Sequence, residues 1–113
     1  LDSRFERQHK RGALEMLVLS LVCEKPAHGY ELLSEIAQRS GGALTLKEGT
    51  LYPVLYRLED DGCIVSEWSA SGRAAPKKVY RVTDAGREEL ARERRIWNSF
   101  CRMINQFVGE ETP

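Results

Sequence analysis

The sequence lacks a membrane segment, a secretion signal and a metal-binding pattern. No apolar run approaches the roughly 20 residues that a membrane-spanning helix needs. Residues 1–11 are charged throughout and carry no apolar stretch of the kind found in signal peptides. The three cysteines and two histidines form no CxxC pair and no ligand-like spacing. We therefore expect a cytoplasmic protein with free thiols, no bound metal and no membrane partner.

Enzyme motifs are missing as well. The chain contains no GxSxG, HExxH, P-loop or dinucleotide-binding fingerprint, and its carboxylates are scattered along the surfaces of expected helices. Its 17 basic and 17 acidic residues balance, so it lacks the overall positive charge of many nucleic-acid-binding proteins. We expect no catalytic activity and no cofactor, and any contact with nucleic acid has to come from local basic segments.

What is present is strong helical periodicity in a chain of 113 residues, the size of one domain. Residues 12–24 carry one apolar stripe at core-facing spacing and a second stripe that contains Met16, Leu19 and Cys23. A helix that is apolar on two faces needs two surfaces to pack against. The domain's own core covers one face, and a second subunit is the simplest partner for the other.

Two further helices with a short connection between them follow. Pro26 ends the first helix, and Gly41 and Gly42 end the second. Because proline is best tolerated in a first helical turn, Pro53 places the start of the third helix near residues 48–50. This third helix has an apolar edge and an outer edge formed by Thr50, Tyr52, Pro53, Tyr56 and Arg57.

The outer edge has two interpretations. Its tyrosines could simply cover the core, or the edge could lie in the major groove of DNA, which admits one α-helix. Tyrosine and threonine hydroxyls bond phosphates or base edges, and Arg57 can do either. The DNA interpretation is favoured because two helices with a short connection match a helix-turn-helix arrangement. Tyr30, in the second helix, is balanced between a core role and a phosphate contact.

Two strand-like segments come next, residues 64–68 and 79–83, and they predict a hairpin. Its tip is basic, since residues 69–81 contain no acid and four cations: Arg73, Lys77, Lys78 and Arg81. Such a charge run is often only a solvated loop. Directly after a groove-reading helix, phosphate or minor-groove contact by Arg73, Lys77 and Lys78 is favoured. A helix-turn-helix followed by this hairpin is a winged helix.

The last helix is expected over residues 85–108, with N-cap chemistry from Thr83 and Asp84. Trp97 on this helix has two open interpretations: an anchor of the contact with a second subunit, or a platform on which a flat aromatic ligand stacks. We divide the chain into residues 1–83, the DNA-binding unit, and residues 84–113, a dimerisation helix of the same structural unit. The heptad-like spacing predicts a subunit contact through Leu90, Trp97, Phe100, Ile104 and Phe107.

Four segments together resemble the PadR family of transcriptional regulators: LEMLVLSLV, HGYELLSEI, EGTLYPVLYRLEDDG and KKVYRVTDAGREEL. The single C-terminal helix is similar to the short subgroup of that family. The resemblance implies a homodimeric repressor that dimerises through its first and last helices. It also implies binding to an inverted-repeat operator in double-stranded DNA and release from it on binding a small aromatic or hydrophobic effector.

Family members with a tryptophan in the last helix resemble multidrug-binding regulators, in which that ring lines a pocket at the dimer interface. For this chain the resemblance implies an effector pocket formed by Met16, Glu93, Trp97 and Cys101. The chain departs from those members in its wing, which reads SGRAAPKK where many have a denser basic run, and in the bulk of Phe100.

The sequence therefore predicts a mainly α protein with a small β-hairpin wing (α+β), a winged helix-turn-helix with a long C-terminal dimerisation helix. The expected function is a sequence-specific transcriptional regulator. The alternative is a ligand- or protein-interaction module that uses this fold without reading an operator. The expected DNA-binding residues are Tyr30, Thr50, Tyr52, Pro53, Tyr56, Arg57, Arg73, Lys77 and Lys78. The expected dimer interface contains Met16, Leu19, Leu90, Trp97, Phe100, Ile104 and Phe107.

Overall fold

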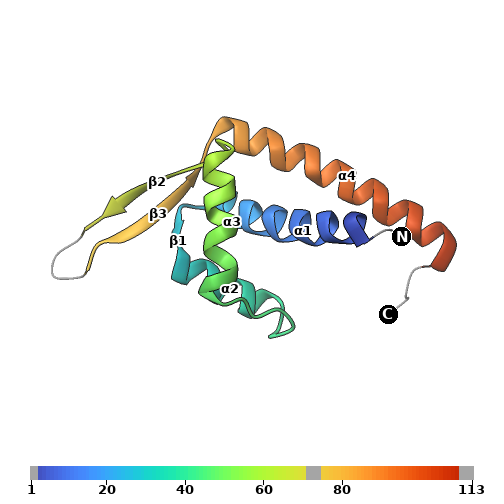
Figure 1. The fold of residues 1–113 in the computed structure, drawn as a ribbon, viewed down its shortest axis with the longest axis horizontal. Coiled ribbons are helices and arrows are strands. Elements are labelled where there is room, and N and C mark those ends of the chain that lie inside the picture. The colour runs from blue at the N-terminus through green and yellow to red at the C-terminus, as the bar shows by residue number, and fades with distance from the viewer. Residues whose placement is uncertain (1–2, 71–74, 110–113) are drawn as a thin grey trace.

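The computed structural model describes residues 3–70 and 75–109, with side chains from Gly12 onward. Within these residues, helices and strands follow one another along the chain (Figure 1). Their order is α1 (Ser3–Glu24), β1 (Ala27–His28), α2 (Gly29–Arg39), α3 (Glu48–Asp60), β2 (Ile64–Ser69), β3 (Lys77–Val82) and α4 (Asp84–Val108). This order confirms the predicted winged helix-turn-helix with a long last helix.

The three strands form an antiparallel sheet in the order β1-β3-β2. Strand β1 was not predicted, because two residues are too few to display an alternating pattern. It pairs Ala27 with Tyr80 and so joins the start of α2 to the hairpin. Residues 44–47, between α2 and α3, form a connection without helix or strand. The first helix is longer than predicted, since α1 begins at Ser3 and not near Gly12.

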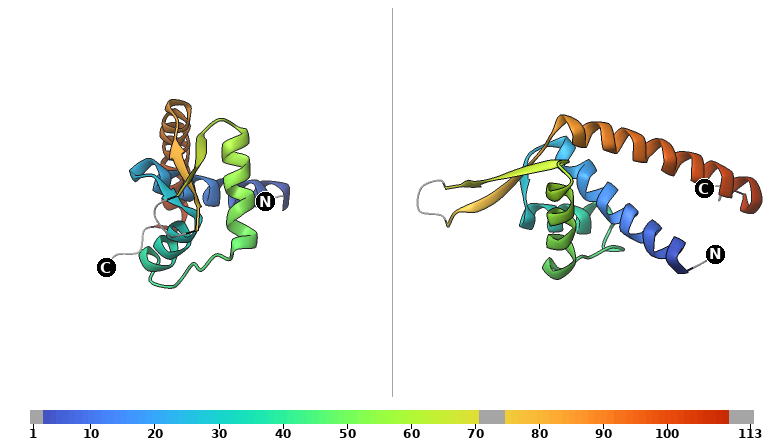
Figure 2. Two further views of the ribbon diagram at one scale, coloured as in Figure 1. Left: turned by 90° about the vertical axis from the view of Figure 1, so that its left-hand side faces the viewer. Right: turned by 45° about the horizontal axis from the view of Figure 1, so that its top comes forward.

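Helix α3 stands between the two ends of an elongated molecule (Figure 1). The β2–β3 hairpin projects on one side of α3, and α1 and α4 extend on the other. Figures 1 and 2 show that α4 follows α1 in the opposite direction, and the two helices are in contact. The elements expected to contact DNA and the expected dimerisation helices therefore occupy different parts of one fold.

Side chains fix the starts of α2 and α4. The His28 ring accepts a hydrogen bond from the Glu31 backbone N–H, and the Glu31 carboxylate accepts one from the His28 N–H, which is a capping box. At α4, the Thr83 hydroxyl accepts from the Gly86 N–H at 3.0 Å, as its sequence position predicts.

Pro53 lies in the second turn of α3 and not in the first. Because it has no N–H, it leaves the Gly49 carbonyl without its usual i+4 donor. The predicted start of the helix was nevertheless right, at Glu48.

The core lies where α1, α2, α3 and the base of the sheet meet. Leu19 is fully buried in this core, and so are Val18 and Leu51. Val22 is only 1% exposed. Leu19 was expected at a dimer interface, and so was Leu90, which is 7% exposed. This expectation is wrong for both, because α3, α4 and β3 already cover α1 from several sides within one chain. Their side chains leave almost no surface for a second subunit.

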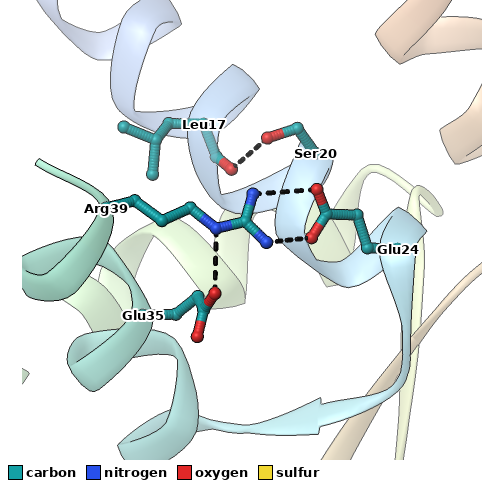
Figure 3. Close-up of polar contacts among 5 residues, drawn as sticks. All are labelled: Leu17, Ser20, Glu24, Glu35 and Arg39. Carbon is teal, nitrogen blue, oxygen red and sulfur yellow. Dashed lines mark hydrogen bonds and ion pairs between the residues drawn. The ribbon is translucent and has the colours of Figure 1, made fainter.

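An arginine joins the second helix to the first (Figure 3). The Arg39 guanidinium donates two hydrogen bonds to Glu24, at 2.9 Å and 2.5 Å, and one to Glu35 at 2.8 Å. The hydrogen bond from Arg39 lowers the pKa of the Glu24 carboxyl. These side chains are exposed to a large extent, so the bridge mainly fixes where α2 sits relative to the end of α1.

Candidate nucleic-acid interface and ligand groove

The outer face of α3 is available for contact. The helix turns four apolar side chains into the core, namely Leu51, Val54, Leu55 and Leu58. This burial leaves Thr50 and Pro53 exposed. Tyr56 is 71% exposed and Tyr52 is 44% exposed. Four of the five side chains predicted for this face are therefore exposed, and the fifth, Arg57, is partly buried.

Tyr52 owes its place to a glycine on the neighbouring helix. A Cβ atom added at Gly29, the first residue of α2, would lie 2.5 Å from the Tyr52 hydroxyl oxygen and 2.9 Å from its Cζ. The ring therefore rests directly on the backbone at the start of α2. This contact fixes the tyrosine at the junction between the two helices of the helix-turn-helix.

Arg57 differs from the expectation. Its Nε donates to Glu15 of α1 at 2.8 Å, and this pair is partly buried. The guanidinium is thus directed to α1 and away from the centre of the outer face. Helical spacing places residue 57 at the edge of that face, and periodicity cannot tell which neighbour a long side chain at an edge will meet.

Tyr30 is 74% exposed at the start of α2. It borders a hollow whose charged members are Glu24, Lys25, Glu31, Glu35 and Arg39. This hollow has three carboxylates and two cations, so its net charge is less favourable for binding a phosphate than that of the wing.

On the wing, only part of the predicted basic segment is free. Lys77 is exposed, whereas the Lys78 ammonium lies 3.9 Å from Glu59 of α3 and 5.8 Å from the centre of the Tyr80 ring. Arg81 pairs with Glu67 at 2.8 Å. Arg73 falls outside the described residues. Glu59 also accepts a hydrogen bond from the Ser66 hydroxyl at 2.5 Å, so this one carboxylate joins α3 to both strands of the wing.

Trp68 on β2 was not among the predicted contact residues, yet it is 70% exposed. It pairs with Lys78 across the hairpin. The alternation of Ile64, Ser66 and Trp68 on one strand face was the available signal.

A groove runs between α1 and α4, and Trp97 borders two hollows in it. One hollow, of about 200 Å³, is bordered by Glu93, Ile96 and Phe100, and the other, of about 360 Å³, by Leu17, Leu90 and Arg94. Ala13, Met16 and Trp97 border both. The Trp97 and Phe100 rings are tilted by 37° with centroids 6.4 Å apart. Of the predicted pocket residues, Met16, Glu93 and Trp97 come together here, while Cys101 borders neither hollow.

Glu93 gives the smaller hollow an acidic wall. Its Oε2 atom is buried and has no hydrogen-bond partner among the described residues. Burial, and then repulsion by Glu15, raises the pKa of the Glu93 carboxyl. Arg94 borders the larger hollow. The two hollows therefore differ in the sign of the charged residue that borders them.

An apolar stripe on α4 is left uncovered by α1. Ile96 is 63% exposed, Met103 is 43% exposed and Phe107 is 82% exposed. Phe107 was predicted for a subunit contact, but Ile96 and Met103 were not, because the heptad pattern was centred on Leu90 and Trp97. The exposed stripe therefore lies on a different side of α4 from the predicted contact, which was centred on Leu90 and Trp97.

Two absences hold for the part of the chain that the structure describes. No helix there is long and apolar enough to cross a membrane. Nor do three or more His, Cys, Asp or Glu side chains gather there as a metal site would require.

The arrangement of helices, wing and long last helix matches known proteins over most of the chain. The family model described as "Transcriptional regulator PadR-like family" matches residues 18–92. The chain belongs to the PadR-like family. Transcriptional regulator Rv3488 of Mycobacterium tuberculosis is 36% identical to this PadR-like chain over 99 residues, 87% of this chain and 88% of that protein. Negative transcriptional regulator PadR of Bacillus subtilis is 31% identical over 77 residues, 68% of this chain and 42% of that protein.

Solved structures agree with this assignment. A transcriptional regulator from Clostridium thermocellum superposes with a TM-score of 0.80 at 31% identity, covering 87% of this chain and 95% of that one. A PadR family transcriptional regulator from Eggerthella lenta gives 0.78 at 34% identity, covering 96% and 93%. The protein is therefore a DNA-binding transcriptional regulator of the PadR family and not an enzyme, as the sequence predicted.

Proposed function

We propose that this PadR-like protein is a homodimeric repressor that binds an inverted-repeat operator. The observation that carries the proposal is the outer face of α3, where Tyr52, Pro53 and Tyr56 reach solvent beside the wing. Side chains of this kind suit a major groove, since they combine hydroxyl donors and acceptors with apolar surface. Reading chromosomal DNA also places the protein in the cytoplasm.

The proposed DNA contacts come from two elements. Thr50, Tyr52, Pro53 and Tyr56 enter the major groove from α3. Lys77 and Lys78, together with Arg73, hold flanking phosphates from the wing, and Tyr30 contributes at the edge. Arg57 is proposed to act indirectly, by holding α3 against α1 through Glu15.

The uncovered stripe on α4 supports the dimer. Ile96, Met103 and Phe107 form an exposed apolar surface, and such surfaces on soluble proteins mark places of association. We propose that they pack on the second subunit together with Met16, Trp97, Phe100 and Ile104. A two-fold axis there would present two copies of α3 to successive major grooves about 34 Å apart.

The groove around Trp97 supports effector control. An aromatic ligand would stack on the indole, and a positively charged group on it would pair with Glu93 in the smaller hollow. Because both hollows lie between α1 and α4, a bound ligand would alter the angle between these helices and hence the spacing of the two α3 helices. Such a ligand releases DNA only if it binds the two arrangements with different affinity.

Selection of duplexes from a random pool, followed by titration of the enriched duplex at several salt concentrations, tests operator reading. We expect enrichment of an inverted repeat, and we expect Tyr56→Ala and Lys77→Ala to weaken its binding. Arg95→Ala is the matched control for charge, because Arg95 is exposed on α4, away from α3 and the wing. If the protein enriches no sequence, the alternative holds, namely a ligand- or protein-interaction module that does not read an operator.

The effector proposal has its own test. An aromatic cation and a neutral aromatic compound of the same size are titrated while tryptophan fluorescence and operator binding are followed. We expect the cation to quench fluorescence and release DNA, and Glu93→Gln to reduce its advantage over the neutral compound. Release that occurs equally well with Trp97→Ala would place the effector elsewhere.

A further inference from the structure

Trp68 is a large apolar side chain on the wing that the fold leaves uncovered. It is 70% exposed, although a tryptophan contributes one of the largest apolar surfaces of any residue. Single exposed apolar residues are common on proteins and by themselves mean little. The position of Trp68 relative to α3 and to the cations of the wing indicates that this residue takes part in binding.

Strand geometry directs Trp68 to the same side of the wing as α3. Side chains on a strand alternate between its two faces, so Ile64, Ser66 and Trp68 share one face. Ile64 is buried in the core, and Ser66 donates to Glu59 of α3 at 2.5 Å. Trp68 is the next residue on this face, and it lies beyond the part of the hairpin that α3 covers.

The charges around Trp68 favour an anionic partner. The sequence from Trp68 to Lys78 contains no acidic residue. Lys78 is the direct cross-strand neighbour of Trp68 on the same face, where its ammonium lies 3.9 Å from Glu59, and Lys77 is exposed on the opposite face of β3. The nearest acid along β2 is Glu67, which points to the opposite face and is paired with Arg81.

We propose that Trp68 is a DNA-contacting residue of this regulator, packing its ring on the sugar–phosphate backbone next to the groove that α3 enters. The indole N–H would donate to a phosphate oxygen, and the ring would cover the deoxyribose. Glu59 acts as a positioning residue, because its contacts with Ser66 and Lys78 hold the wing against α3. This inference rests on the proposed operator binding and adds a contact that carries no charge.

Direct contact is tested on the full chain with 5-fluorotryptophan in place of tryptophan. The chain has two tryptophans, so the ¹⁹F spectrum has two resonances, which Trp68→Phe and Trp97→Phe assign. On adding the selected duplex, we expect the Trp68 resonance to shift and to lose its sensitivity to solvent exchange between H₂O and D₂O. A Trp68 resonance unchanged in saturated complex would overturn the inference.

Affinity measurements separate an apolar contact from an ionic one. We expect Trp68→Ala to weaken operator binding about tenfold, as truncation of a buried interface aromatic does, while Trp68→Phe recovers much of the loss. The slope of log affinity against log salt should stay unchanged for Trp68→Ala, whereas loss of a phosphate-bound lysine at Lys77 should reduce it by about 0.9. Val65→Ala is the matched control, because Val65 is 51% exposed on the opposite face of β2.

The outcomes distinguish this inference from the proposed function. If the unsubstituted protein selects no operator, the proposed function fails, and the inference fails with it. If the operator binds and Trp68→Ala binds it as well as the unsubstituted protein does, only the inference fails. If Trp68→Ala alters the oligomeric state without DNA, measured by sedimentation, Trp68 contacts a second copy of the chain and the inference is likewise wrong.

Discussion

The Arg57 Nε donates to the Glu15 carboxylate at 2.8 Å and so ties α3 to α1. Because both side chains are partly exposed, we expect a double-mutant cycle of Glu15→Gln and Arg57→Ala to give a coupling of about 0.5 kcal/mol in urea unfolding. For Arg57→Ala, the slope of log operator affinity against log salt concentration should equal that of the unsubstituted protein, since the guanidinium neutralises no phosphate. A slope reduced by about 0.9 would mean that Arg57 leaves Glu15 for the DNA, as the sequence alone suggested.

Gly29→Ala should displace the Tyr52 ring although Tyr52 is not substituted. The added Cβ would meet the Tyr52 hydroxyl at 2.5 Å, and the partly exposed ring can swing away. We expect the free energy of unfolding to change by less than about 1 kcal/mol, and operator binding to weaken by about 1 kcal/mol through the lost hydroxyl contact. Fluorescence anisotropy of labelled operator measures the effect. Tyr52→Phe is the control, and an unchanged affinity in both variants would remove Tyr52 from the interface.

Glu59→Gln should strengthen operator binding. The amide oxygen still accepts from Ser66, but the charge that holds Lys78 at 3.9 Å is gone, so the ammonium becomes free for a phosphate. We expect the salt slope to steepen by up to about 0.9. Glu67→Gln is the matched control, because it releases Arg81 on the other face of the hairpin. Equal gains in both variants would indicate a general charge effect and no specific release of Lys78.

Glu93 should make stability depend on pH. Burial and Glu15 raise the pKa of its carboxyl above the ordinary 4.5, so the folded state holds this proton more tightly than the unfolded state does. Stability therefore falls as pH rises from 4.5 through the folded pKa, and the loss persists at neutral pH. We expect Glu93→Gln to raise the free energy of unfolding at pH 7, because the amide carries no charge that burial would desolvate or that Glu15 would repel. The difference should vanish below pH 4.5, and a gain that persists there would contradict it.

Ile96→Glu should separate the subunits of the proposed dimer. Ile96 is 63% exposed in the single chain, so a glutamate there leaves the fold intact but places a charge in the apolar contact. Sedimentation equilibrium should give the mass of one chain for this variant. Arg95→Glu, on the polar side of the same turn, should leave the mass unchanged. A dimer that survives Ile96→Glu would place the interface on another surface.

The fold could be predicted from local signals. The 3.6-residue period, Pro53 and the Thr83 cap located the helices to within a few residues for α3 and α4, because caps and periodicity depend on nearby backbone. The two-residue strand β1 was missed, since its only determinant is a partner far along the chain at Tyr80.

The sequence by itself determined the winged helix, the family and an outer face of α3 rich in tyrosine. Tertiary structure decided which neighbour each edge residue meets, since Arg57 pairs with Glu15 and Lys78 with Glu59. It also decided that Leu19 lies in the core and not at a subunit contact. It also left Ile96 and Trp68 uncovered. The physical reason is that periodicity fixes the direction of a side chain about its own helix or strand. Burial and pairing depend on how separate elements pack together, and no local pattern records that.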